Sequence, residues 1–83
     1  MASYSLFVKR SAAKELEAVT TKDRRRIVDR IQALAAEPRP SGVEKLSGAD
    51  KYRVRRGVYR ILYTIDDEAR TVVVVKIGHR GDV

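Results

Sequence analysis

The sequence contains no cysteine and no tryptophan, and it has one histidine and two prolines in 83 residues. The lack of cysteine excludes disulfides, cysteine-ligated zinc sites and thiol catalysis. A single histidine with scattered carboxylates leaves little to hold a transition metal, so we expect no metal and no other cofactor. The longest apolar run, Val72 to Val75, is far shorter than the roughly 20 residues of a membrane span. The first residues also lack the pattern of a secretory signal, and we therefore expect a cytoplasmic protein without a membrane partner.

Positive charge is what the chain has in excess. It carries 18 Lys and Arg residues against 11 Asp and Glu, a net charge of +7. A typical domain has about 100–150 residues, so we expect one domain over residues 1–83. Such a basic domain is expected to meet polyanions, which means nucleic acid, an acidic protein or both. A basic surface without such a partner is the alternative.

Hydrophobic periodicity predicts two helices early in the chain. Helical spacing of apolar residues indicates a short helix over residues 12–19, capped by Ser11. A longer amphipathic helix is expected over residues 22–36, starting at Thr20 or Thr21 and ending before Pro38. Residues 38–48 contain both prolines and two glycines, and we expect a loop there.

Strand patterns surround this helical hairpin. Alternation predicts a strand over residues 3–9 and two strands that meet at Gly57, over residues 51–56 and 58–65. Residues 71–77 are apolar on both faces, as expected of a strand buried between layers. The predicted order is β-α-α-β-β-β. It indicates an α+β fold in which the helical hairpin packs on one face of a mostly antiparallel sheet.

The placement of four arginines is more informative than the number of basic residues. Arg53 and Arg55 lie two apart on a predicted strand, so both side chains leave the sheet on one face. Arg60 lies on the next strand, and Arg80 follows the last strand. Guanidinium groups suit phosphate because they stay charged and bind it with two donors. We expect these arginines to gather at one sheet face, the alternative being a solvated face.

The other candidate residues each have a structural interpretation as well as a functional one. His79 is the one side chain that titrates easily near neutral pH, so it is a candidate for proton transfer beside Arg80, or else a structural residue. The run Arg24 to Arg26 is expected to be a solvated helix face with non-specific phosphate contacts at most. Tyr52, Tyr59 and Tyr63 are expected in the core, base stacking being the alternative.

Two segments together carry a specific pattern. Tyr52 to Asp67 is similar to a hairpin pattern Y-R-V-R-x-G-x-Y-R-I-x-Y, and Val75 to Arg80 is similar to a terminal G-H-R segment. Both patterns are typical of the RelE/ParE superfamily of toxins from type II toxin–antitoxin systems, which the chain resembles over nearly its full length. Pro38 and the segment Lys45 to Gly48 support the resemblance.

The resemblance implies a RelE-like mRNA interferase, a metal-independent endoribonuclease that cuts mRNA in the ribosomal A site. In such an enzyme the ribose 2′-hydroxyl attacks the adjacent phosphorus and the 5′-oxygen leaves. The partners that the resemblance implies are a RelB-like antitoxin and mRNA in the ribosome, with operator DNA bound only through the toxin–antitoxin complex. The residues that match the family's catalytic positions are Arg53, Arg55, Arg60, His79 and Arg80. Further RNA contacts are expected from Lys45, Lys51 and Arg56.

The sequence departs from the family pattern in two respects. Some relatives have lysines at the positions of Arg53 and Arg55, and arginine accepts a proton poorly, so these two are expected to stabilise charge. Active relatives usually continue to a tyrosine at the point where this sequence reaches Val83. We therefore expect reduced activity of the chain as given. The alternatives are a ParE-like toxin that poisons DNA gyrase and a non-catalytic, antitoxin-binding co-repressor.

Overall fold

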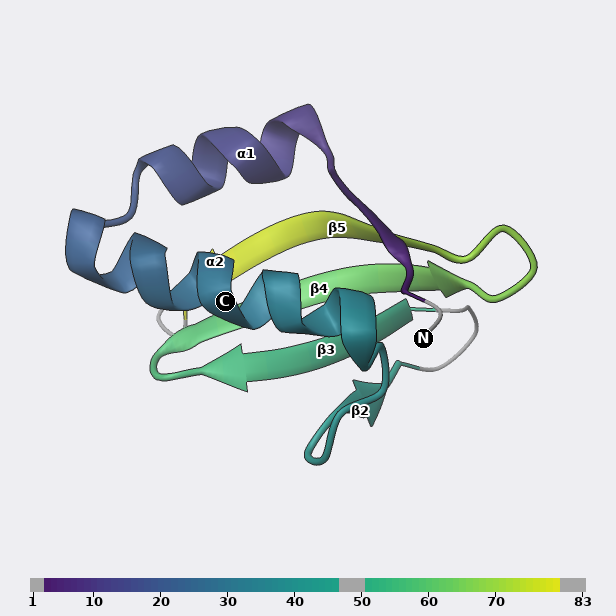
Figure 1. Ribbon diagram of the computed structural model, residues 1–83. Coiled ribbons are helices and arrows are strands. Elements are labelled where there is room, and N and C mark those ends of the chain that lie inside the picture. The colour runs from purple at the N-terminus through teal and green to yellow at the C-terminus, as the bar shows by residue number, and fades with distance from the viewer. Residues whose placement is uncertain (1–2, 47–50, 80–83) are drawn as a thin grey trace.

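The structure is a computed structural model, which describes residues 3–46 and 51–79. In chain order its elements are β1 (Ser5–Val8), α1 (Arg10–Glu17), α2 (Thr21–Ala36), β2 (Glu44–Lys45), β3 (Lys51–Arg56), β4 (Tyr59–Asp66) and β5 (Thr71–His79). The strands form one sheet in the order β1-β5-β4-β3-β2, with β1 parallel to β5 and all other neighbours antiparallel. Both helices cover the same face of this sheet (Figure 1). The expected α+β fold with a mostly antiparallel sheet is confirmed.

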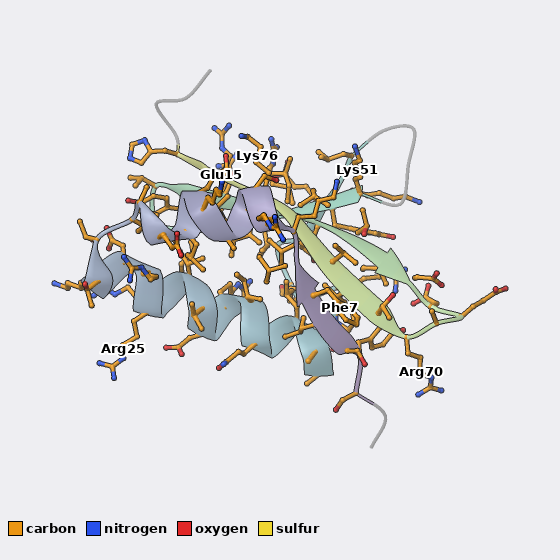
Figure 2. The ribbon with its side chains drawn as sticks, turned by 90° about the horizontal axis from the view of Figure 1, so that it is seen from above. Phe7, Glu15, Arg25, Lys51, Arg70 and Lys76 are labelled. Carbon is orange, nitrogen blue, oxygen red and sulfur yellow. The ribbon has the colours of Figure 1, made fainter. Side chains whose placement is uncertain are left out.

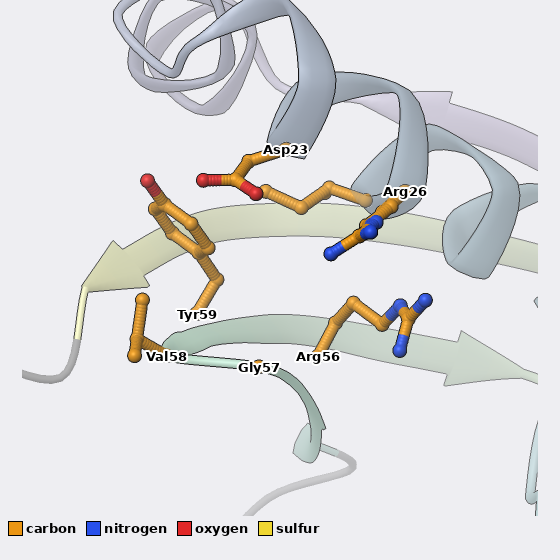
Figure 3. A pocket seen from close by; sticks show the side chains of 7 residues that line it. Asp23, Arg26, Arg56, Gly57, Val58 and Tyr59 are labelled. Atoms are coloured by element: carbon orange, nitrogen blue, oxygen red, sulfur yellow. The ribbon is translucent and has the colours of Figure 1, made fainter.

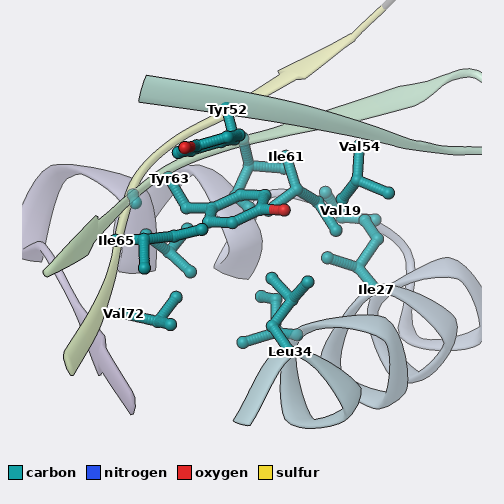
Figure 4. Packing of buried hydrophobic residues seen from close by; sticks show 13 residues of the cluster. Val19, Ile27, Leu34, Tyr52, Val54, Ile61, Tyr63, Ile65 and Val72 are labelled. Carbon is teal, nitrogen blue, oxygen red and sulfur yellow. The ribbon is translucent and has the colours of Figure 1, made fainter. Parts of the chain in front are cut away.

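The core lies between the helical hairpin and the sheet. Side chains alternate between the two faces of a strand, so every second residue of β3 and β4 points at the helices. These inward residues pack against the buried side of α2 (Figure 4). The buried residues are Ala12, Val19, Ile27, Ile31, Leu34, Tyr52, Val54, Ile61, Tyr63, Ile65, Val72, Val74 and Ile77. Tyr52 and Tyr63 stack with their ring centres 5.9 Å apart, which confirms the core reading of these two residues.

The helix boundaries are set by different means. The hydroxyl of Thr20 accepts a hydrogen bond from the backbone N–H of Asp23 at 3.5 Å, so of the two predicted N-cap candidates, Thr20 and Thr21, the first is the cap. The first helix begins earlier than predicted, at Arg10, and its N-cap is Lys9 without a side-chain bond. The expected cap by Ser11 is therefore wrong. That residue is already helical, because the chain turns from β1 into α1 within a single residue.

The β3–β4 connection matches its prediction closely. The turn consists of Gly57 and Val58, and Gly57 has a φ of +63°. A positive φ at the first residue of a two-residue hairpin turn is what a type II′ turn requires, and glycine adopts it at no steric cost.

The loop after α2 holds a short strand that the sequence did not predict. The loop is tied to the sheet where it begins, because the hydroxyl of buried Tyr63 donates to the carbonyl of Pro38 at 2.7 Å. Arg39 then forms a two-pronged ion pair with Asp67. The following residues pair Glu44 with Arg53 and Lys45 with Tyr52, so β2 becomes the edge of the sheet. Two residues are too few to show an alternating pattern in the sequence.

The last strand differs from its prediction in extent and in faces. β5 runs to His79, and its register with β4 shifts between Leu62 and Tyr63. Because of this shift, Val75 has no partner residue on β4. The buried residues are therefore Val72 and Val74 before the shift and Ile77 after it. The bulge explains why Ile77 is buried together with Val72 and Val74, although strict alternation would place it on the other face. One face is buried under the helices, and the other is half-buried. Within the described ranges, no helix is long and apolar enough to cross a membrane.

Candidate nucleic-acid interface

Three of the predicted arginines meet on the sheet face that the helices leave open. Tyr52 and Val54 are buried under α2, so Arg53 and Arg55 point the opposite way. Arg60 stands directly across from Arg55 in the antiparallel pair of β3 and β4, and directly opposed residues share a face. Arg53, Arg55 and Arg60 are called the arginine face below. Like charges directly opposed across two strands repel each other, so an anion between them is favourable.

The structure provides one such anion from the chain itself. The carboxylate of Glu44 on β2 accepts a hydrogen bond from Nη2 of Arg53 at 3.1 Å, and its other oxygen lies 3.9 Å from Nε of Arg55. The hydrogen bond from Arg53, together with the charges of Arg53, Arg55 and Arg60, lowers the pKa of Glu44. Glu44 is therefore ionised at neutral pH and acts as the counter-ion of the arginine face.

Sequence reasoning missed Glu44 because it placed this residue in a loop. A usable signal was that Glu44 is the one carboxylate of residues 38–48, but its register on β3 depends on the anchored loop. Glu44 neutralises only part of the positive charge, because it supplies one negative charge for three guanidinium groups. Nε of Arg53 is buried, and in the described part of the chain it has no hydrogen-bond acceptor. With one carboxylate beside three guanidinium groups, the arginine face keeps an excess of positive charge, which favours a further anion such as a phosphate group.

Lys51 belongs to the same face as the three arginines. It alternates with Arg53 along β3, pairs with Thr64 of β4 and is exposed. Lys51 lengthens the row of positive side chains along the open side of β3. A row of this kind follows a phosphate backbone without reading base sequence.

The remaining predicted residues do not join the arginine face. His79 pairs with Tyr59, whose side chain is on the helix-covered side, and the two rings contact edge to face at 5.2 Å. Arg56 pairs with Tyr59 from the other strand, and Lys45 pairs with buried Tyr52, so both also belong to the helix-covered side. His79 lies at the same end of the sheet as Arg60, but its side chain leaves from the opposite face. Arg80 lies outside the described residues.

The position of His79 could have been found in the sequence. His79 is two residues beyond buried Ile77, so it shares that residue's face wherever the strand continues to it. The prediction ended the strand at residue 77 and lost this information.

Arg24 has a structural role where a solvated helix face was expected. Its Nε donates to the carbonyl of Leu16 at 3.2 Å. Its Nη2 donates to the carbonyls of Glu17 and Val19 at 2.8 and 3.0 Å. The carbonyls of Leu16 and Glu17 lie at the C-terminal end of α1, where the last helical carbonyls have no partner within the helix, and that of Val19 lies in the connection to α2. The guanidinium of Arg24 therefore joins α1 to α2, while Arg25 points away from the molecule (Figure 2).

A second carboxylate contact lies on β5 beyond Val74, where β1 no longer pairs with this strand. Glu15 of α1 accepts a hydrogen bond from Nζ of Lys76 at 2.8 Å and another from the backbone N–H of Ile77 at 3.1 Å (Figure 2). The hydrogen bond from Lys76 is the main reason that the pKa of Glu15 is lowered. Within the described ranges, no three His, Asp or Glu side chains gather as a metal site would require.

The family model described as the ParE toxin of the type II toxin–antitoxin system parDE matches residues 6–83. The chain belongs to this family. It is thus a type II toxin of the RelE/ParE superfamily, as the sequence resemblance predicted. Among curated relatives, toxin RelG of Mycobacterium tuberculosis is 51% identical over 35 residues. That match spans 42% of this chain and 40% of the relative.

Solved structures of the superfamily match this toxin along almost its whole length. A chain of the archaeal RelE–RelB complex from Pyrococcus horikoshii is 28% identical, with a TM-score of 0.87 and coverage of 98% of this toxin and 99% of that chain. The toxin–antitoxin complex RelBE2 of Mycobacterium tuberculosis gives 31% identity and a TM-score of 0.84, covering 94% and 99%. The isolated RelE toxin of E. coli gives 25% identity and a TM-score of 0.83, covering 98% and 88%.

Proposed function

We propose that this toxin is a ribosome-dependent endoribonuclease that cleaves mRNA without a metal ion. The observation that supports the proposal is the arginine face. Three guanidinium groups lie on one open sheet surface, with the carboxylate of Glu44 beside two of them. The likeness to RelE structures points the same way.

The proposed reaction is an attack within the RNA chain. The 2′-oxygen of a ribose forms a bond to the adjacent phosphorus, and the bond from phosphorus to the 5′-oxygen breaks. The 2′-hydroxyl loses its proton to a base, the leaving 5′-oxygen takes up a proton, and a 2′,3′-cyclic phosphate remains. Negative charge builds up on the phosphoryl oxygens in the transition state. Arg53, Arg55 and Arg60 would stabilise that charge, as fixed positive groups do in other phosphoryl-transfer sites.

The arginines do not accept the proton, because their guanidinium groups hold their own protons too tightly. Glu44 is a poor acceptor for the opposite reason, since a carboxyl group with a lowered pKa has little affinity for a proton. We propose His79 for proton transfer and Arg80 for charge stabilisation. A catalytic His79 requires the RNA to reach past the end of the sheet. Replacing His79 with glutamine should then abolish cleavage while RNA binding persists.

An antitoxin is the proposed protein partner. The structural relatives include toxin–antitoxin complexes from Pyrococcus horikoshii and Mycobacterium tuberculosis. With a net charge of +7, this toxin would bind most readily to an acidic antitoxin segment. Operator DNA would be bound only through the toxin–antitoxin complex.

The test is to induce the toxin in cells and map mRNA ends by primer extension. Cuts should appear within translated regions and only on ribosomes. They should fall at least about 100-fold in Arg60→Ala and in Arg53→Ala, because each removes a charge from the transition state. Arg25→Ala is the matched control, since it removes the same charge from an exposed helix position.

A second candidate is a gyrase poison, which the ParE description of the matched family favours. A supercoiling assay with purified gyrase separates the two. Inhibited supercoiling without mRNA cuts would replace the nuclease proposal with this one. Growth arrest relieved by a co-expressed antitoxin is expected of both, and its absence would instead support a non-catalytic co-repressor.

A further inference from the structure

A pocket of about 290 Å³ lies between the start of α2 and the β3–β4 turn, on the sheet side opposite to the arginine face. Asp23 and Arg26 line it from α2, and Arg56, Val58 and Tyr59 line it from the hairpin. Figure 3 shows Arg26 reaching from the helix above Arg56 on the strand. The Asp23 carboxylate and the Tyr59 ring lie beside each other at the other end of the pocket (Figure 3).

The basic end of this pocket lacks the counter-ion that the arginine face has. Among the residues that the structure describes, neither Arg26 nor Arg56 forms an ion pair, whereas Arg53 and Arg55 contact Glu44. Two guanidinium groups that approach one pocket from different elements repel each other. An anion held between them removes that repulsion and gains charge-assisted hydrogen bonds from both.

The other end of the pocket suits a base and a sugar. The ring of Tyr59 is half-buried and lines the pocket, and Val58 is 40% exposed beside it. An aromatic ring next to a basic groove is the usual platform for a base of single-stranded RNA. The pocket volume, close to 300 Å³, lies at the lower end of the range of sites for small organic ligands.

The carboxylate of Asp23 narrows the choice of anion. Because it lines the same pocket, it repels a dianion such as inorganic phosphate and a peptide with clustered carboxylates. A phosphodiester carries one negative charge, and the ribose next to it has a hydroxyl that can donate to a carboxylate. An RNA nucleotide therefore fits this combination of charges better than an acidic protein segment does.

The pocket also continues the proposed RNA surface. A second, smaller hollow of about 80 Å³ is lined by Arg55 and Arg60 on one side of the turn. Gly57, Val58 and Tyr59 line both hollows, so only the turn separates them. A single RNA strand that crosses the turn can place one phosphate at Arg55 and Arg60 and another at Arg26 and Arg56.

We propose that the pocket between α2 and the β3–β4 turn binds one nucleotide of the RNA that flanks the cleavage position. Arg26 and Arg56 hold its phosphate, and its base packs on Tyr59 and Val58. This inference rests on RNA being the substrate. It concerns binding outside the arginine face, so the two can fail separately.

The test measures binding of a single-stranded oligoribonucleotide of about 12 nucleotides to the full chain by fluorescence anisotropy over a series of salt concentrations. Arg26→Ala and Arg56→Ala should each weaken binding about tenfold. Each should also reduce the slope of log affinity against log salt by about 0.7, the value for one phosphate contact on a single strand. Arg25 is the neighbour of Arg26 on the exposed side of α2. Arg25→Ala should therefore leave the affinity and the salt slope close to those of the unchanged chain.

Inorganic polyphosphate is the competing probe for charge alone. It should bind less tightly than the oligoribonucleotide, and equal or tighter binding would overturn the assignment of a nucleotide. Equal losses in Arg26→Ala and Arg25→Ala would also overturn it, as would failure of the unchanged chain to bind RNA even at low salt. Weaker antitoxin binding with unchanged RNA binding would assign the pocket to the protein partner instead. Cleavage lost in Arg60→Ala but retained in Arg26→Ala with unchanged affinity would leave the proposed nuclease standing and refute the pocket.

Discussion

Replacing Arg24 with alanine should loosen the first helix from the second. The guanidinium of Arg24 donates three hydrogen bonds to carbonyls at the end of α1 and in the connection that follows it, at 2.8 to 3.2 Å. α1 has eight residues, too few for a helix to be stable by itself in water. Its attachment therefore depends on packing against β5, on the hydrogen bonds that Glu15 accepts from β5, and on the Arg24 contact. Alanine at position 24 removes that contact without filling its place.

The size of the effect follows from the chemistry of the contact. A hydrogen bond made by a charged group contributes about 1.5–3 kcal/mol to stability, but water can replace part of this at a partly exposed site. For the three bonds together we expect a loss of about 2–3 kcal/mol in the free energy of unfolding. A domain of this size loses about 4–8 °C for each kcal/mol, so Tm should fall by about 10–20 °C.

Urea denaturation followed by circular dichroism measures this loss, with Arg25→Ala as the matched control. Arg25 is exposed on the same helix, and its replacement should change stability by less than about 0.5 kcal/mol. Arg24→Lys keeps the charge but not the fork of donors, and it should recover only part of the loss. If Arg24→Ala and Arg25→Ala have the same stability, the contact does not fasten α1 and the reasoning fails.

Three further replacements test other contacts. Glu44→Gln should raise affinity for a single-stranded oligoribonucleotide about two- to fivefold in an anisotropy titration, because the arginine face loses its own anion. In Asp67→Asn, the free energy of unfolding should fall less steeply with decreasing pH below about pH 4 than it does in the unchanged chain. The hydrogen bond from Arg39 lowers the pKa of Asp67 in the folded state, so the native pair stabilises the fold above the unfolded pKa and is lost as pH falls. Tyr63→Phe should cost about 1–2 kcal/mol in chemical denaturation, because the carbonyl of Pro38 loses its buried donor.

Each of these replacements has an outcome that would contradict it. Unchanged or weaker RNA binding in Glu44→Gln would show that the carboxylate does not compete with phosphate. An acid-denaturation curve of Asp67→Asn that is as steep as that of the unchanged chain would place the acid sensitivity in other carboxylates. Stability retained in Tyr63→Phe would mean that water reaches the carbonyl of Pro38.

Patterns of two and of 3.6 residues made much of the fold predictable. Tyr52 and Val54 alternate with Arg53 and Arg55, so the sequence predicts both the strand and the face on which the arginines stand. Gly57 marks the turn because a residue with positive φ is needed there. Local patterns decide features of this kind without knowledge of the remaining chain.

Other features depend on partners far along the chain. Glu44 reaches Arg53 only because Pro38 and Arg39 fix the loop before it, and no periodic pattern records such anchoring. Arg24 looks like a residue of a solvated stripe, since the carbonyls that it contacts belong to the preceding helix. The bulge at Val75 changes which residues of β5 are buried, and a run of four valines gives no sign of where it lies.

The parallel pairing of β1 with β5 also sets an order for folding. β1 joins Ser5 to Thr71 and Val8 to Val74, whereas β3, β4 and β5 pair with strands next to them in sequence. Closing a long loop costs entropy before its contacts form, so the hairpins can assemble first and β1 must dock afterwards. β1 has no strand to pair with until residues 71–74 have left the ribosome. Until then the sheet, which carries the helices on one face and the arginine face on the other, is incomplete. The β3–β4 hairpin that carries the arginine face can thus form before β1 docks, and the sheet is complete only once β1 has paired with β5.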